Sequence, residues 1–162
     1  MTHVGRALTA KGVKPIVSYQ QAFKNTYLYG SYSPIDGSHF TWEVEGVDTL
    51  IFEAYIKAFS LYKPEELKVV VIDNAGFHST KNINIPDNIR LIRIPPYTPE
   101  LNPCEKVWQY LKERFKNRTF ENIKELKLWL NQTVKTEINN ENIINIVKSE
   151  FYINTFKACF KL

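Results

Sequence analysis

The chain has 162 residues, of which 44% are hydrophobic and 14% aromatic, and it carries a formal net charge of +4 at pH 7. This composition excludes a disordered chain, and the length favours one domain with a substantial core over two independent domains. No apolar run approaches the roughly 20 residues of a membrane helix, and the first residues lack a secretory signal, so we expect a soluble cytoplasmic protein with no membrane partner.

The first half of the chain predicts a hairpin followed by a helix. Aromatic and β-branched residues at 27–33 and 39–44 flank Pro-Ile-Asp-Gly, which is a turn signal between two antiparallel strands. Asp48 or Thr49 is placed to cap a helix that runs to about residue 60, in which apolar residues recur at i+3 and i+4. We therefore expect this helix to pack on a sheet.

The second half predicts two further strands and then helices. Residues 67–72 are almost entirely apolar, as in a strand covered on both faces, and residues 89–94 form a second strand of mixed pattern. The apolar period becomes helical at residues 103–117, 123–135 and 143–156. The order strand, strand, helix, strand, strand, helices predicts a layered α/β domain.

The basic surplus lies in the second part of the chain. The first 60 residues carry five Lys and Arg and five Asp and Glu, which leaves 16 basic and 12 acidic residues after them. The densest part includes Lys106, Lys112 and Arg114. Such a surplus permits nucleic-acid binding, but an ordinary solvated helix face explains it equally well. Cys104 and Cys159 lack metal-ligand spacing and are interpreted as packing residues.

A candidate carboxylate lies at the end of the third predicted strand. Asp73 directly follows Val-Val-Val-Ile, so a buried strand would carry it to the carboxyl edge of a sheet, where open α/β folds hold ligands. The alternative is structural, because Asp73 can begin an Asx-turn with Asn74 before Gly76. Asp73 alone does not decide between these two interpretations.

A second acid follows a proline-rich approach to a helix. Pro103 suits the first position of a helix that Asn102 can cap, and Glu105 then falls at the third position. There it either forms a capping box with Asn102 or is aimed at Asp73 by the core residues of its helix. Two carboxylates so placed bind hard cations such as Mg²⁺ or Mn²⁺, and two such ions about 3.5–4 Å apart could clamp a phosphodiester.

Two segments of the chain resemble a known family. Residues 71–78, Val-Ile-Asp-Asn-Ala-Gly-Phe-His, and residues 92–108, Ile-Arg-Ile-Pro-Pro-Tyr-Thr-Pro-Glu-Leu-Asn-Pro-Cys-Glu-Lys-Val-Trp, are similar to the signature of insertion-sequence transposases of the mariner superfamily. The resemblance implies a DDE-type endonuclease domain with a ribonuclease-H-like, three-layer α/β fold and a mixed sheet. In that family three acids hold two Mg²⁺ or Mn²⁺ ions for DNA cleavage and strand joining. By position, Asp73 matches the second acid and Glu105 the third.

The extent of the resemblance sets the expected domain boundaries. It implies a single domain over residues 1–162, with a catalytic core over about 5–135 and helices over about 136–162. In the family the first acid lies on a strand upstream of the first Gly-Arg stretch, so we expect that strand to be missing and the chain to be N-terminally truncated. Asp36 and Asp48 are poor substitutes, because they are placed in a turn and at a helix cap.

The resemblance also implies partners and secondary site residues. His78 completes the family's Asp-Asn-x-x-x-His pattern and could orient a carboxylate or contact a phosphate, whereas Asn74 is expected to hold the adjoining loop. Lys106, Lys112 and Arg114 could contact the phosphates that flank the cut in transposon-end or target DNA. A missing strand would leave a sheet edge open to self-association or to pairing with an N-terminal fragment.

The absence of the first acid predicts that this chain alone is catalytically inactive. Two carboxylates without a third leave both metal ions under-coordinated, because positioning and charge neutralisation act together. We therefore expect the 162-residue chain alone neither to nick supercoiled plasmid DNA nor to join DNA ends at an appreciable rate in Mg²⁺. Mg²⁺-dependent nicking that Asp73→Ala abolishes would contradict this expectation.

Two other functions stay open at this point. A non-catalytic DNA-binding or regulatory fragment that pairs with a full-length transposase would give weak, salt-sensitive DNA binding without cleavage. A different ribonuclease-H-like nuclease would act on RNA but not on DNA. Binding and cleavage assays on both nucleic acids therefore separate the three functions.

Overall fold

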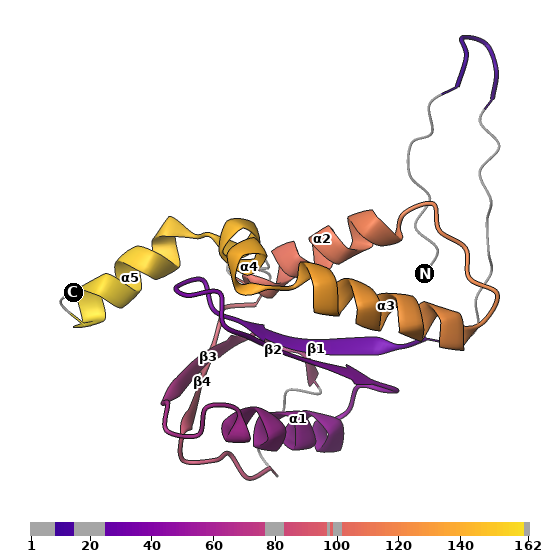
Figure 1. Ribbon diagram of the computed structural model, residues 1–162. Helices are drawn as coiled ribbons and strands as arrows, with labels where there is room; N and C mark the ends of the chain where they lie inside the picture. The colour runs from indigo at the N-terminus through magenta and orange to yellow at the C-terminus, as the bar shows by residue number, and fades with distance from the viewer. Residues whose placement is uncertain (1–8, 15–24, 77–82, 97, 99–101, 161–162) are drawn as a thin grey trace.

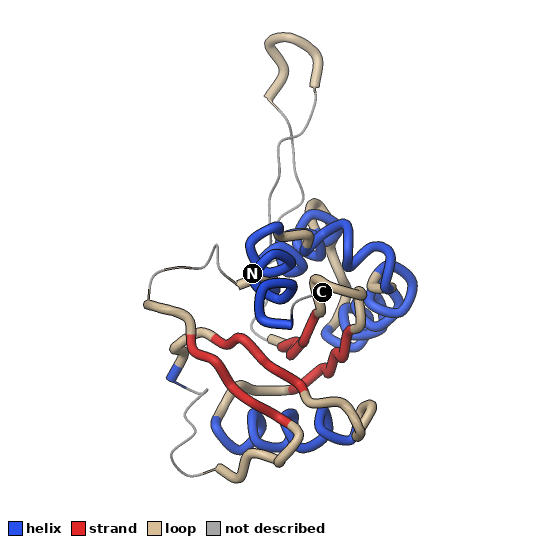
Figure 2. The backbone as a smooth tube through the Cα atoms, turned by 90° about the vertical axis from the view of Figure 1, so that its left-hand side faces the viewer, coloured by secondary structure: helices blue, strands red, loops and turns tan. Residues whose placement is uncertain are grey.

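The computed structural model describes residues 9–14, 25–76, 83–96, 98 and 102–160. Among the described helices, none combines the length and the apolar character needed to span a bilayer. Figures 1 and 2 show the strands lying between one helix on one side and a group of helices on the other. The α/β class expected from the sequence is confirmed.

The hairpin forms where the sequence predicts it. Strands β1 (Tyr27–Tyr32) and β2 (His39–Val44) pair in antiparallel register along their full length. In the turn between them, the Ser33 amide donates to the carbonyl of Ser38 (2.8 Å) and the Asp36 carboxylate accepts from the Ser38 amide (3.0 Å). Asp36 is thus engaged within the turn, as expected.

Helix α1 (Thr49–Leu61) covers one side of the strands. It begins after Asp48, whose carboxylate accepts a hydrogen bond from the amide of Ile51 at 2.8 Å. This is the N-cap geometry that stabilises a helix start. The predicted capping role of Asp48 is therefore confirmed.

Strands β3 (Lys68–Ile72) and β4 (Ile89–Arg93) form a parallel pair, separate from the hairpin among the described residues. The expectation that residues 67–72 are covered on both faces is wrong, because Leu67 is 65% and Val69 is 55% exposed. Helix α1 packs against only one face of this pair. No described element buries the apolar residues of the other face.

Four helices complete the chain: α2 (Cys104–Phe115), α3 (Ile123–Glu137), α4 (Asn140–Val147) and α5 (Glu150–Phe160). The prediction of one helix over 143–156 is wrong. Helix α4 begins earlier, because the Asn139 side chain caps it, and it ends where Lys148 adopts an extended conformation. A new helix then starts after Ser149, whose carbonyl accepts from Ile153. Helix α5 projects from the rest of the molecule (Figure 1).

The hairpin separates two hydrophobic cores. The first core lies towards α1 and consists of Tyr29, Val44, Phe52, Tyr55, Ile56, Ile72 and Ile89. The second core lies towards α2 and α4 and consists of Val107, Leu111, Ile138, Ile143 and Val147. Because alternate residues of a strand face opposite sides, Tyr29 enters the first core while Leu28 and Tyr32 pack against the second. Trp108 also packs against the second core.

The hairpin turn is packed closely against α4. Gly37 has a φ of +73°, and a Cβ at this position would lie 2.1 Å from the carbonyl oxygen of Asn140. We expect Gly37→Ala to lower the free energy of unfolding by about 2 kcal/mol or more, because it adds both backbone strain and a collision with backbone. Denaturant unfolding followed by tryptophan fluorescence measures this change.

Gly46→Ala is the matched control for Gly37→Ala. A Cβ at Gly46 would meet only the Ile51 side chain, at an ordinary contact distance of 3.6 Å. We expect this substitution to change stability by less than about 0.5 kcal/mol. Equal unfolding midpoints for the two variants would show that the turn is not held against α4.

Candidate functional site

The first candidate carboxylate lies directly after β3. Asp73 is half-buried, and its Oδ1 accepts a hydrogen bond from the Ala75 amide at 3.0 Å. This contact is the Asx-turn that the sequence allowed as a structural alternative. The turn fixes the carboxylate at the end of a strand, so the structural role and a ligand role require the same placement.

The ends of the two parallel strands are tied together beside Asp73. The Asn74 side-chain amide donates to the carbonyl of Ile94 at 2.7 Å, and the Ile94 amide donates to the carbonyl of Ile72 at 3.0 Å. Arg93 donates to the Asp73 carbonyl at 3.4 Å. Asn74 therefore holds the loop, as predicted from the sequence.

The second candidate carboxylate lies in the first turn of α2. Asn102 accepts from the Cys104 amide at 3.1 Å, so it caps the helix, and Pro103 has helical dihedral angles. Glu105 is exposed, and among the described residues its carboxylate forms no hydrogen bond to the Asn102 amide. The capping box is thus not formed by these residues. An acid in the first turn also interacts favourably with the helix dipole.

Cys104 is the first residue of α2 and directly precedes Glu105. Its thiol donates to the carbonyl of Gly30 in β1 at 3.5 Å, which ties the start of α2 to the hairpin. Burial raises the pKa of the Cys104 thiol to about 12, with further increases from the negative charges of Glu105 and then Asp73. The negative charges of both carboxylates therefore disfavour the thiolate form of Cys104. The thiol stays protonated at neutral pH and packs, as expected.

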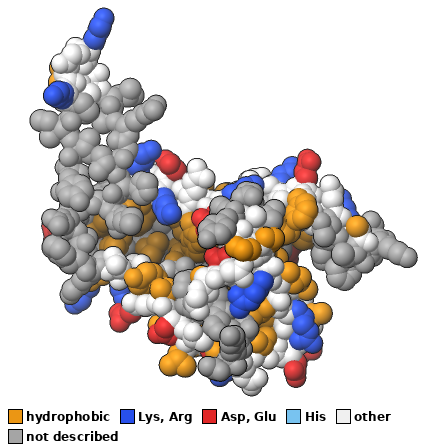
Figure 3. Space-filling model, turned by 180° about the vertical axis from the view of Figure 1, so that it is seen from behind, with side chains coloured by type: hydrophobic (Ala, Val, Ile, Leu, Met, Phe, Trp, Pro, Cys, Tyr) orange, Lys and Arg blue, Asp and Glu red, His pale blue; other side chains and the backbone are white. Residues whose placement is uncertain are grey.

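The three basic residues predicted to contact DNA have different environments. Lys106 donates to the carbonyl of Lys148 at 3.2 Å. The side chain of Lys112 is exposed and forms no hydrogen bond or ion pair with the described residues. Arg114 pairs with Glu137 of α3. On the face seen in Figure 3, basic, acidic and hydrophobic side chains are interspersed.

Arg114 belongs to a network that joins α2 to the end of α3. Its guanidinium pairs with the Glu137 carboxylate and lies 3.4 Å from the centre of the Tyr110 ring. The Tyr110 hydroxyl donates to Glu137 at 2.7 Å. Hydrogen bonds from Tyr110 and Arg114 lower the pKa of Glu137. Local sequence patterns could not predict this network, because Glu137 lies 23 residues from Arg114 and 27 residues from Tyr110.

Other predicted site residues can be placed only in part. His78 lies outside the described residues. Within the described ranges, no group of three or more His, Cys, Asp or Glu side chains is arranged to hold a metal ion. Asp73 at the end of β3 and Glu105 in the first turn of α2 are the two predicted acids that the described part of the chain contains.

Comparisons with known proteins add two matches. A family model described as DDE superfamily endonuclease matches residues 1–127. The chain is also 47% identical over 53 residues to the uncharacterized protein y4pE/y4sA of Sinorhizobium fredii (strain NBRC 101917 / NGR234). That alignment covers 32% of this chain and 39% of the relative, so the chain spans about two fifths of its length. No solved structure matches the chain.

Proposed function

Because the chain belongs to the DDE superfamily endonucleases, whose family model matches residues 1–127, we propose that it is a catalytic-domain fragment of a DNA transposase of the mariner superfamily. Its substrates are the phosphodiesters of transposon ends and target DNA. The parent activity hydrolyses a phosphodiester at the transposon end, and the freed 3′ hydroxyl then attacks target DNA.

The observation that carries this proposal is the family match over residues 1–127, which includes both candidate acids. Asp73 and Glu105 come from different elements, 32 residues apart in sequence, and both raise the pKa of the Cys104 thiol. Endonucleases of this superfamily use divalent metal ions. A pair of carboxylates fits such a group, because hard cations such as Mg²⁺ and Mn²⁺ prefer oxygen ligands.

We assign Asp73 and Glu105 as two of the metal ligands. When bound, divalent ions stabilise the negative charge that develops on a phosphodiester under attack. The chain's own contribution is positioning: the Asx-turn after β3 fixes Asp73, and the capped start of α2 fixes Glu105. The Cys104 thiol ties the start of α2 to β1 through its hydrogen bond to the Gly30 carbonyl.

Lys112 is the basic residue that we assign to DNA phosphate. It lies seven residues after Glu105, which is about two helical turns, so both project from the same side of α2 and are about 10 Å apart along its axis. Arg114 lies nine residues after Glu105, about half a turn further round, where Glu137 pairs with it. We therefore assign Arg114 a structural role.

We further propose that the described elements belong to a ribonuclease-H-like, three-layer fold and that residues 1–162 act as one domain. The layers of Figure 1 support the fold, with α1 on one side of the strands and α2, α3 and α4 on the other. The second core supports the single domain, because α2 and α4 both contribute to it. Self-association and pairing with another fragment stay proposals of the same kind.

Iron-directed cleavage tests the metal site without requiring activity. Fe²⁺ replaces Mg²⁺ in oxygen-ligand sites, and with ascorbate and peroxide it generates hydroxyl radicals that cut the backbone near the bound ion. We expect cuts near Asp73 and near Glu105 that excess Mg²⁺ suppresses and that urea abolishes. Cuts confined to other parts of the chain would refute the assignment of these two acids.

A further inference from the structure

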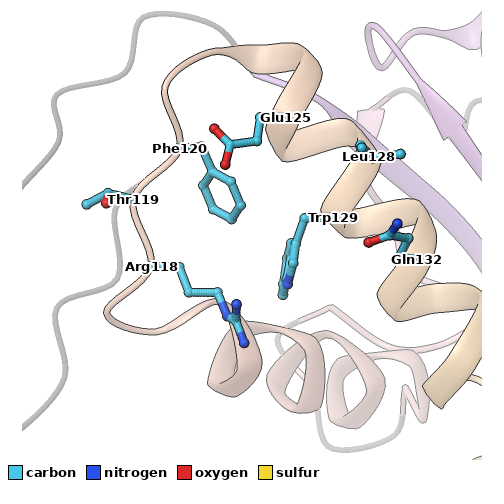
Figure 4. A pocket seen from close by; sticks show the side chains of 7 residues that line it. All are labelled: Arg118, Thr119, Phe120, Glu125, Leu128, Trp129 and Gln132. Atoms are coloured by element: carbon cyan, nitrogen blue, oxygen red, sulfur yellow. The ribbon is translucent and has the colours of Figure 1, made fainter.

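A pocket of about 360 Å³ lies between the end of α2 and the first half of α3, at the opposite end of α2 from Glu105. Figure 4 shows its side chains, which come from the connecting loop and from one side of α3. Its size lies within the range of sites that bind small molecules or single groups of a larger ligand. The pocket takes no part in the site of Asp73 and Glu105.

One wall of this pocket is aromatic and fixed in place. The rings of Phe120 and Trp129 lie 5.6 Å apart between centroids, and the ring of Phe115 stands behind both at 5.5 and 5.7 Å. Three mutually packed rings hold one another in position. The Phe120 and Trp129 rings are tilted by 49° to each other, so they form an angled apolar wall, and a flat ring can stack on one of its two faces.

A positive charge stands at the rim of the aromatic wall. Arg118 is exposed, its Nε donates to the Arg114 carbonyl at 2.8 Å, and its guanidinium carbon lies 5.4 Å from the centre of the Trp129 ring. These two contacts orient the guanidinium beside the ring. Glu125 also lines the pocket, but its carboxylate accepts from the amide of Glu121 at 2.7 Å, just before α3 begins.

The surroundings of the pocket favour an anionic ligand. Residues 112–135 contain seven Lys and Arg and three Asp and Glu. Arg114 and Lys127 pair with acids outside this stretch, which leaves a surplus of two positive charges. The side-chain amide of Gln132 lines the pocket and forms no hydrogen bond with the described residues. A ligand with a flat ring, hydrogen-bonding edges and a linked phosphate matches all of these features, and a nucleotide has them.

We propose that this pocket binds an unstacked nucleobase of single-stranded DNA, with the base against Phe120 and Trp129 and its phosphate at Arg118. The inference rests on the proposed function, because that function supplies the DNA. Helix α2 has 12 residues and is about 18 Å long, so the pocket lies roughly one helix length from Glu105. The pocket would hold a strand end away from the cut.

Binding of a fluorescent single-stranded oligonucleotide, followed by anisotropy at low salt, tests the pocket. We expect Arg118→Gln to weaken binding about tenfold, because it removes both a phosphate contact and the support of the stacking surface. Lys157→Gln removes the same charge from exposed α5, which lies at the far end of the molecule (Figure 1), and should weaken binding about twofold or less. Equal losses in the two variants would overturn the proposal.

Photocrosslinking of the unaltered chain provides a readout that does not depend on the folding of variants. An oligonucleotide that contains 5-bromodeoxyuridine should crosslink to a peptide that includes Phe120 or Trp129. Crosslinks confined to peptides outside residues 115–132 would overturn the pocket while leaving the iron-directed cuts at Asp73 and Glu105 intact. Loss of those cuts with a crosslink at Trp129 would overturn the metal site and keep the pocket.

Discussion

Replacing both candidate metal ligands, with Asp73→Asn and Glu105→Gln in one chain, is expected to weaken Mn²⁺ binding at least about a hundredfold. Mutating residues that only hydrogen-bond to metal ligands already lowers metal affinity by about 10- to 100-fold. Loss of two direct anionic ligands should therefore lower it further. Asn at position 73 keeps an oxygen that can accept from Ala75, so the Asx-turn is retained. Electron paramagnetic resonance of free Mn²⁺ measures the affinity.

Glu113→Gln is the matched control for the ligand variant. Glu113 is an exposed acid on the same helix as Glu105, and its carboxylate pairs with Lys116 at 3.3 Å. We expect this variant to bind Mn²⁺ within about twofold of the unaltered chain, because a surface charge is largely screened. If the double variant and Glu113→Gln bind Mn²⁺ equally, Asp73 and Glu105 are not a metal site.

Truncation of one side chain in the first core should produce the largest loss of stability. Phe52 is 2% exposed and packs against Tyr29, with ring centroids 6.4 Å apart. We expect Phe52→Ala to lower the free energy of unfolding by about 3–5 kcal/mol, because it removes buried apolar area and leaves a cavity. This is a large part of the roughly 5–15 kcal/mol that stabilises a domain. Urea unfolding gives the value.

The same helix supplies the control for Phe52→Ala. Leu50 is 75% exposed, so Leu50→Ala should change stability by less than about 0.5 kcal/mol. The core that contains Phe52 also contains Ile72, the residue before Asp73. Loosening this core should therefore lower Mn²⁺ affinity as well. A Phe52→Ala chain with unchanged stability would mean that α1 is not packed as described.

Local sequence signals predicted the elements that place the two acids. The apolar run before Asp73 and the sequence Asn102-Pro103 before Glu105 each specify a strand end or a helix start within a few residues. The contact between Cys104 and Gly30 could not be predicted in this way, because these residues are 74 positions apart. Interactions across that span depend on tertiary packing.

The errors have equally specific causes. The break between α4 and α5 falls at Lys148 and Ser149, where no Gly or Pro marks it and the apolar period continues. The exposed face of β3, which includes Val69, was mispredicted because an apolar run reports what a strand can bury and not which elements cover it. The aromatic pocket at Trp129 was also missed, because it arises where two helices meet.

The second core has a consequence for where this protein can be shortened. The family match ends at residue 127, yet Ile138, Ile143 and Val147 lie beyond it and bury Val107 and Leu111 of the helix that carries Glu105. A polypeptide cut at residue 127 would expose the apolar residues Val107 and Leu111 of α2 to solvent. We expect such a polypeptide to aggregate on expression. Retaining the chain through α4 preserves the helix that presents Glu105, so the smallest usable version is set by packing and not by sequence similarity.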